Sequence, residues 1–231
     1  MHFLTRGRLH KIREEIADRL IAPGARVLEI GCGTGSLAML LAERGVKVVG
    51  IDTSHEMLSC AQERLAGASY AAQVELKKLS ALEIEDTFDD GAFDYVVNLL
   101  ILSEMSDDEV DCVLLQCRRV LQSGGCLIVV DEVEPEGFWR RWTLRALRFP
   151  IRLATFLILQ AKDLKSGNIF KKILYYVIEF PLMLLTFLVV PPVSHPLSEL
   201  EDRVRQAGFR IVRSETFLGE TLRFLHAERL A

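Results

Sequence analysis

Arg26 to Gly35, which read RVLEIGCGTG, decide the fold. The first half of this stretch is a short, mostly apolar run, which suits a buried strand of a parallel sheet. The second half places three glycines where the strand ends and a helical segment, residues 36–44, begins. Glycine lets a backbone approach a ligand closely, and the free N–H groups of a helix N-terminus attract negative groups. The stretch therefore predicts a strand, a ligand-binding loop and a helix in succession.

Strand-like and helix-like segments alternate along the first 131 residues. Apolar runs predict strands over residues 26–31, 46–51, 74–78, 93–100 and 126–130. Helical spacing predicts helices over residues 8–20, 36–44, 54–66 and 107–121, the last of which is ended by Gly124-Gly125. Near the C-terminus we expect a helix over 197–207, stopped by Gly208, and two alternating strands around Gly219-Glu220. This order predicts an α/β fold with a doubly wound, mostly parallel sheet and a C-terminal hairpin.

The charge balance gives no general case for nucleic-acid binding, because the net charge is −4. Its distribution is uneven: residues 138–172 carry nine Lys/Arg and one acid, a local charge of +8 that leaves −12 elsewhere. The five cysteines show no zinc-type spacing, so we expect reduced thiols and no metal site. The N-terminus lacks the apolar core of a signal peptide, and we expect a cytoplasmic protein.

An acid follows the glycine loop at the end of the second expected strand. This residue, Asp52, can accept both hydroxyls of a ribose. A dinucleotide fingerprint would need a third glycine where this chain has Ser36, which disfavours an NAD-linked oxidoreductase. The observed pattern is E-x-G-x-G-x-G from Glu29 to Gly35, with DTSHEML beginning at Asp52. It resembles motif I of the class I S-adenosylmethionine (SAM)-dependent methyltransferases.

That resemblance implies a seven-stranded sheet whose last two strands are antiparallel, and a site for SAM and its product S-adenosylhomocysteine. Glu29 and the glycine loop would hold the methionine part, and Asp52 would bind the ribose. The third expected strand lacks the family's usual acid, so an adenine contact there would use Ser80 or backbone. The end of the fourth expected strand would lie beside the sulfonium. The implied cofactor residues are Glu29, Gly31, Cys32, Gly33, Gly35, Asp52, Thr53, Met57, Ser80, Ala81, Asn98 and Leu99.

A narrower resemblance covers most of the chain. The segments GRLHKI, NLLILSEM, VVDEVEPEGF and FPLMLLTFLVV, with the EDRVRQAGF helix, are similar to corrinoid-protein-associated methyltransferases. Quinone-biosynthesis methyltransferases share the core motifs but match the C-terminal third less well. The resemblance implies methyl transfer to an unidentified acceptor, either a hydrophobic small molecule or one carried by a partner such as a corrinoid protein.

Three acids are candidates for acceptor binding or for a general base: Glu104, Asp131 and Glu132. All three follow expected strands at the edge where open α/β sheets bind ligands. Each could equally be a helix cap or a solvated loop acid. Methyl transfer depends above all on alignment of the acceptor with the S–CH3 bond, and a base is needed only when the acceptor must lose a proton.

A long insertion, residues 138–195, lies between the fifth and sixth expected strands within a single methyltransferase domain, residues 1–231. Its first part places Arg141, Arg145, Arg148 and Arg152 on one helical face and apolar side chains on another, as in helices that lie in a membrane surface. A membrane span is disfavoured, because the strands that follow must return to the same sheet. The open alternatives are extra core helices, a lid over the acceptor, a homodimer interface, or peripheral contact of 138–172 with an anionic membrane at the inner face. A second hypothesis for the whole chain is a SAM-binding accessory module that docks on a corrinoid protein or membrane without turnover.

Overall fold

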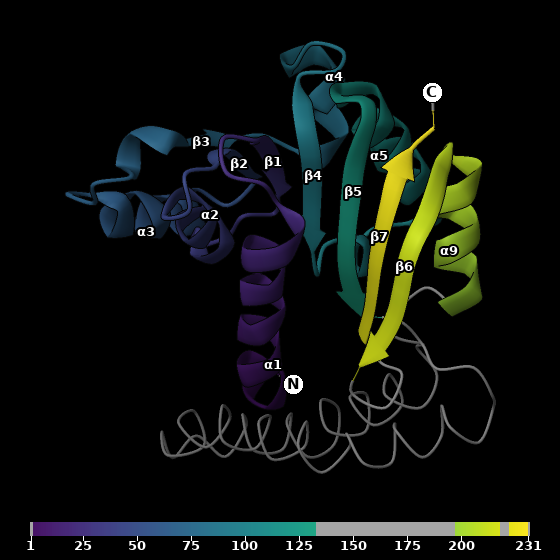
Figure 1. Ribbon diagram of the computed structural model, residues 1–231, viewed down its shortest axis with the longest axis horizontal. Helices are drawn as coiled ribbons and strands as arrows, with labels where there is room; N and C mark the ends of the chain where they lie inside the picture. The colour runs from purple at the N-terminus through teal and green to yellow at the C-terminus, as the bar shows by residue number, and fades with distance from the viewer. Residues whose placement is uncertain (1, 133–196, 218–221, 231) are drawn as a thin grey trace, which may run out of the picture.

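The computed structural model describes residues 2–132, 197–217 and 222–230. Seven strands form one sheet (Figure 1). The strands are β1 (Arg26–Ile30), β2 (Lys47–Asp52), β3 (Val74–Lys78), β4 (Phe93–Leu99), β5 (Leu121–Glu132), β6 (Phe209–Phe217) and β7 (Leu222–Arg229). The helices are α1 (His2–Glu15), α2 (Ser36–Ala42), α3 (His55–Leu65), α4 (Ile84–Thr87), α5 (Asp107–Val120) and α9 (Leu197–Gln206). A π-helical segment, Ile16–Leu20, continues α1.

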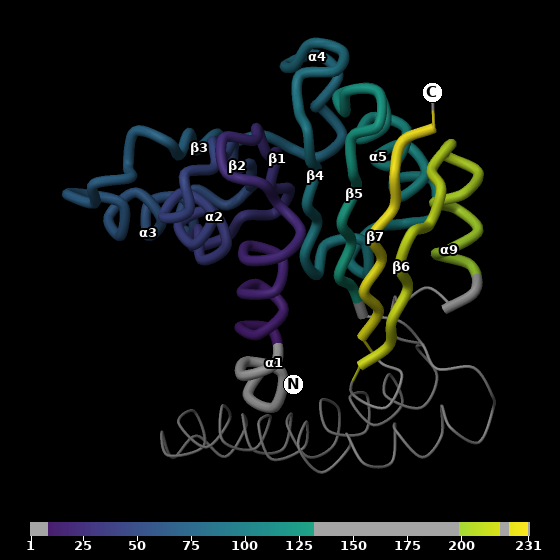
Figure 2. The backbone as a smooth tube through the Cα atoms, viewed as in Figure 1, coloured from purple at the N-terminus to yellow at the C-terminus, as the bar shows by residue number. Residues whose placement is uncertain are grey.

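The strand order is β3-β2-β1-β4-β5-β7-β6. Strands β1 to β5 pair in parallel, and β7 runs antiparallel to both β5 and β6. Figure 2 shows β7 lying between β5 and β6, although it is the last strand in the sequence. This confirms the predicted doubly wound sheet with an antiparallel hairpin. The order reverses between β1 and β4, and ligands of open α/β sheets bind at the carboxyl ends of strands at such a reversal.

Two hydrophobic clusters cover the two faces of the sheet. On one face, Ile12 and Ile16 pack with Leu37 of α2 and with Phe224 of β7. On the other face, the side chains of α4, α5 and α9 pack against the strands, among them Ile84, Val113, Leu114 and Val204. The apolar residues of β1 alternate between the clusters, since Val27 belongs to the first and Leu28 and Ile30 to the second. Both faces of the central strands are therefore buried, as their continuous apolar runs predict.

The predicted boundaries hold with two differences. Helix α5 ends at Val120, and β5 begins at Leu121, so Gly124-Gly125 lie inside the strand segment instead of ending the helix. The register with β4 shifts between Phe93 and Tyr95, which absorbs the extra residues as a bulge. The N-terminal helix is also longer than predicted, because α1 begins at His2.

The insertion over 138–195 lies outside the described residues, so its predicted basic and apolar helical faces stay predictions. Among the helices that the structure does describe, none has the length and apolarity needed to cross a membrane. The chain leaves the sheet at the end of β5 and returns to it through α9 and β6. Both ends of the insertion therefore belong to one sheet, as the sequence predicts.

Candidate cofactor and acceptor site

The glycine loop between β1 and α2 has a backbone that ordinary side chains disfavour. Gly31, Gly33 and Gly35 have φ angles of 69°, 53° and 72°. These are left-handed values, which glycine adopts without steric cost. The N–H groups of Gly31 and Cys32 both donate to the Ile51 carbonyl, at 2.8 and 3.0 Å. The loop is thereby fixed to the end of β2, where Asp52 follows.

Asp52 joins the glycine loop to the start of α3. One carboxylate oxygen accepts from the Gly33 N–H at 2.8 Å, and the other accepts from the Ser54 N–H at 2.9 Å. Each carboxylate oxygen can accept more than one hydrogen bond. Asp52 can therefore hold the loop and still accept from the hydroxyls of a ribose, as predicted for this residue.

Glu29 is a buried carboxyl group at the base of the glycine loop, with 3% of its surface exposed. Its Oε2 has no hydrogen-bond partner in the described part of the chain. Burial raises the pKa of Glu29 to about 8, and the nearby Arg13 guanidinium of α1 opposes that rise. A buried oxygen that lacks a donor fits the ammonium group of a methionine moiety, which would supply both the charge and the hydrogen bond.

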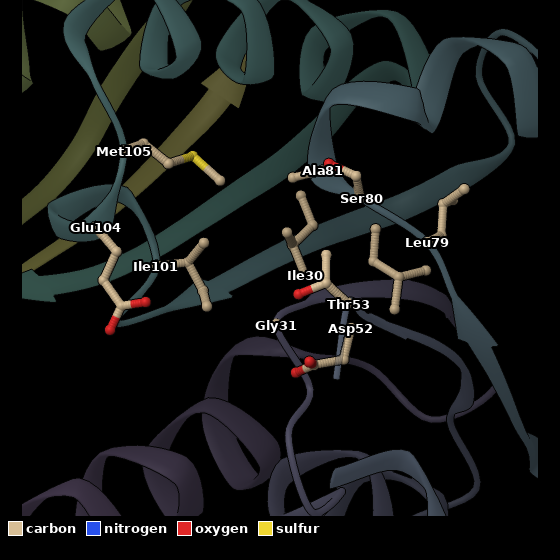
Figure 3. A pocket seen from close by; sticks show the side chains of 11 residues that line it. Ile30, Gly31, Asp52, Thr53, Leu79, Ser80, Ala81, Ile101, Glu104 and Met105 are labelled. Atoms are coloured by element: carbon tan, nitrogen blue, oxygen red, sulfur yellow. The ribbon is translucent and has the colours of Figure 1, made fainter. Parts of the chain in front are cut away.

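A cavity of about 200 Å³ opens beside these groups at the carboxyl ends of the strands. Figure 3 shows Ile101 and Glu104 on one side of it and Asp52 and Thr53 on the other. The described residues that line it are Ile30, Gly31, Ile51, Asp52, Thr53, Leu79, Ser80, Ala81, Ile101, Glu104 and Met105. The cavity thus joins the predicted ribose site, the predicted adenine site and the loop that follows β4.

Asp131 holds the loop that follows β4. Its Oδ2 accepts from the N–H groups of Ile101 and Leu102, at 3.0 and 2.6 Å, and its side chain is only 1% exposed. The residue before them, Leu100, has a φ of 61°, a left-handed value that is uncommon for a residue with a side chain. This geometry gives Asp131 a role in positioning the loop. Its predicted role in acceptor binding or as a base stays a prediction.

The other predicted site residues lie at different depths. Ser80 and Ala81 line the cavity, but the Ser80 hydroxyl also accepts from the Leu82 N–H and caps a short helix. Asn98 and Leu99 are buried at the end of β4, and the Asn98 Oδ1 has no partner among the described residues. Met57 is 47% exposed and does not line the cavity.

Cys32 is buried within the glycine loop, and burial raises the pKa of its thiol, which keeps it uncharged. Glu132 is the last residue of β5 and pairs with Leu222 of β7. Its backbone position beside Asp131 agrees with the predicted strand end, and its role stays a prediction.

The sequence did not indicate roles at the site for three further residues, Arg64, Ile101 and Met105. Arg64 of α3 donates from Nη1 to the Thr34 carbonyl at 2.6 Å and lies 3.1 Å from the hydroxyls of Thr34 and Ser36. Ile101 and Met105 supply apolar cavity wall. The Arg64 contacts join residues about thirty positions apart, so no local pattern signals them. The apolar run that contains Ile101 did signal a strand end but not a contact with the glycine loop.

Comparisons with known proteins agree with this geometry. Residues 27–125 match the family described as a methyltransferase domain. The phosphatidylethanolamine N-methyltransferase of Cereibacter sphaeroides is 37% identical over 119 residues, which cover 52% of this chain and 56% of that protein. The demethylmenaquinone methyltransferase of Bacillus subtilis strain 168 is 32% identical over 121 residues, covering 51% and 50%. The chain thus spans about half the length of these relatives.

A solved magnesium protoporphyrin IX methyltransferase of Synechocystis PCC 6803, with bound SAM, superimposes with a TM-score of 0.60. The match covers 97% of this chain and 79% of that chain at 17% identity, which shows a shared fold. The chain therefore has the fold of the class I SAM-dependent methyltransferases. Within it, residues 27–125 are a methyltransferase domain. The resemblance to quinone-biosynthesis methyltransferases is confirmed, and association with a corrinoid protein stays a prediction.

Proposed function

We propose that the chain transfers a methyl group from SAM to a hydrophobic small molecule, either free or carried by a partner protein. The observation that carries the proposal is a cavity lined by Gly31 and Asp52, with the buried carboxyl group of Glu29 at the base of the same glycine loop. Glu29 offers an unpartnered buried oxygen, and Asp52 keeps acceptor capacity beside the cavity. These groups match the ammonium and the ribose hydroxyls of the cofactor.

Bound SAM supplies an electrophilic methyl group on a sulfonium with a good leaving group. The residues of this chain bind and orient it: Glu29 takes the ammonium, Asp52 the ribose, and Ser80 with Ala81 the adenine edge. Asp131 fixes the backbone of the loop after β4, so that Ile101 forms a wall of the site. Alignment of this kind accounts for much of the acceleration in a displacement reaction.

Two observations support a hydrophobic acceptor: the apolar residues that line the cavity and the names of the relatives. Apolar side chains of Leu79, Ile101 and Met105 form the described walls beyond the polar groups. Relatives are named for phosphatidylethanolamine and for demethylmenaquinone, both of which are lipids. An apolar wall excludes water from the reacting atoms and gains free energy by burying a lipid tail. We therefore favour a lipid-like acceptor.

Asp52→Ala tests the cofactor site. Its loss removes two loop hydrogen bonds and the ribose acceptor, so we expect SAM affinity measured by calorimetry to fall roughly a hundredfold. Asp86→Ala is the matched control, because Asp86 is exposed on α4 and does not line the cavity. Unchanged SAM affinity in Asp52→Ala would show that the cofactor site is misplaced. Folding is checked by the melting temperature of both variants.

Turnover of SAM distinguishes an enzyme from an accessory module that only binds SAM. The full chain is incubated with methyl-labelled SAM and cell extract, and labelled product is separated from the cofactor. A labelled lipid product supports the enzyme. Tight SAM binding without any labelled product favours the accessory module.

Peripheral membrane contact rests on the local charge of +8 over residues 138–172. Sedimentation with anionic liposomes at low and high salt tests it directly, because electrostatic attachment weakens as salt screens the charges. Absence of binding at low salt would remove the idea.

A further inference from the structure

We propose that the acceptor is an amine and that Glu104 binds its ammonium form at the mouth of the cavity. This inference rests on the proposed function and names the acceptor class of the same site. The relatives do not decide it, because one is named for an ethanolamine lipid and another for a quinone precursor. The charges and free polar atoms around the cavity distinguish the two chemistries.

The charged side chains that line the cavity are both acidic. They belong to Asp52 and Glu104, and no Lys or Arg is among the described residues that line the cavity. An anionic acceptor such as a phenolate would approach two carboxylates without a compensating cation. An ammonium would be attracted by both charges, and the attraction would strengthen as the ligand excludes water.

Glu104 is the acid of this pair that has no other task. The carboxylate of Asp52 is used by the N–H groups of Gly33 and Ser54. The Glu104 backbone N–H donates to the Ile101 carbonyl at 3.0 Å. Its side chain forms no hydrogen bond or ion pair with any described residue, although it lines the cavity opposite Asp52 (Figure 3). It lies at the end of the short helix Leu102–Glu104, whose Leu102 N–H is held by Asp131. The carboxylate is thus presented on a fixed backbone.

Asn98 supplies a second, independent observation. In the sheet register it lies beside Ile30, which lines the cavity. Asn98 is 2% exposed, and its Oδ1 has no hydrogen-bond partner in the described part of the chain. A buried carbonyl oxygen without a donor is costly. Asn98 itself is not among the described residues that line the cavity, and the inference assigns an N–H donor of the ligand to its oxygen. A primary amine offers such donors, and a phenolate offers none.

A carboxylate beside the reacting atom affects methyl transfer differently for an amine acceptor and for a phenolate acceptor. The bound ammonium first loses one proton to water, which frees the nitrogen lone pair. That lone pair then forms the N–C bond, and the C–S bonding pair stays with sulfur. Positive charge thereby passes from sulfur to nitrogen, and one N–H proton then leaves to water. A carboxylate beside the nitrogen stabilises that charge. With a phenolate the charges cancel in the transition state, and the same carboxylate would repel the anion on approach.

The test measures ligand preference in the full chain saturated with S-adenosylhomocysteine. The probes are n-octylammonium and 1-octanol, which share one alkyl tail and differ in charge. We expect octylammonium to bind about tenfold more tightly than octanol, the effect of one charge-assisted hydrogen bond. In Glu104→Gln this preference should fall to about twofold or less. Asp108→Asn is the control, since it removes the same charge from an exposed position outside the cavity lining.

Two results would overturn the inference. One is a wild-type chain that does not prefer octylammonium over octanol; the other is a Glu104→Gln variant that keeps the preference. The affinity for S-adenosylhomocysteine is measured in every arm. If that affinity is normal while the amine preference is absent, the amine inference fails and the proposed methyl transfer stands. If the affinity is lost in the wild-type chain, the proposed function fails first.

Discussion

At the scale of a single residue, Glu29 is a buried carboxyl group whose proposed role in cofactor binding would depend on pH. Burial raises its pKa from the ordinary 4.5 to about 8, so at neutral pH the folded chain holds a proton that the unfolded chain has lost. Stability contributed by this site is therefore complete below about pH 4.5 and declines as the pH rises towards 8. The ammonium of the cofactor favours the ionised form, so binding should expel the proton.

We therefore predict that SAM affinity rises between pH 6 and pH 7.5, by at most about tenfold per pH unit. Calorimetry in two buffers of different ionisation enthalpy measures the released proton. Glu29→Gln serves as the comparison, because it keeps the shape and removes the titrating group. Equal pH dependence in the variant and in the wild-type chain would contradict the assignment, since Glu29 would then not be the titrating group.

Gly31 illustrates a steric requirement. A Cβ atom added there would overlap with Cδ1 of Ile101, and the φ of 69° would be strained as well. We predict that Gly31→Ala weakens SAM binding at least about tenfold, as expected for overpacking of 1–3 kcal/mol. Adding Ile101→Ala should restore part of the affinity. Gly45→Ala is the control: it has a φ of 80° but open space around it, so it should lower stability without changing affinity.

At the scale of elements, α3 supports the glycine loop through Arg64. Three contacts from one guanidinium nitrogen reach Thr34 and Ser36. Because Arg64 is exposed, we predict that Arg64→Met lowers the free energy of unfolding by less than about 1 kcal/mol. SAM affinity should fall roughly three- to tenfold, because the loop loses its outer support. Arg19 is an exposed arginine on the π-helical segment Ile16–Leu20, and Arg19→Met is the control. It should change neither the free energy of unfolding nor the SAM affinity. An affinity loss equal to that of Arg64→Met would contradict a specific supporting role for Arg64.

The elements themselves were predictable from the sequence because their patterns are local. The apolar run before Gly31 correctly predicted a strand followed by a glycine loop, and Asp52 lies at the end of the second strand as predicted. The roles of these residues at a cofactor site stay predictions. The contacts between elements were not predictable in this way. Asp131 reaches the backbone of Ile101 across thirty residues, and its role as a loop anchor depends on β4 and β5 being neighbours. The bulge at Gly124-Gly125 also depended on pairing, because glycine pairs alone read equally as a helix stop.

At the scale of the whole molecule, the chain's two ends support one site. Ile12 and Ile16 pack in one cluster with Leu222 and Phe224, so the first helix rests on the last strand. The same helix carries Arg13 towards Glu29. The sheet order that places β7 beside β5 thus brings the last strand into contact with the helix that carries Arg13. The C-terminal hairpin is an antiparallel addition to a parallel sheet, and it also buttresses the helix over the glycine loop.

The ion pair between Arg213 of β6 and Glu15 of α1 tests this connection. Arg213 Nη1 lies 2.6 Å from Glu15 Oε1, although the two residues are 198 positions apart in the sequence. The Arg213 guanidinium carbon also lies 5.2 Å from the centre of the Phe224 ring. A double-mutant cycle with Glu15→Ala and Arg213→Ala should give a coupling energy of about 0.5–1 kcal/mol in urea unfolding, since the pair is only partly exposed. Arg210 and Glu228 form a more exposed pair within the hairpin, and their coupling should be close to zero. If Glu15 and Arg213 showed no coupling, this ion pair would not contribute to anchoring the first helix, which would then rest on the apolar cluster with Leu222 and Phe224.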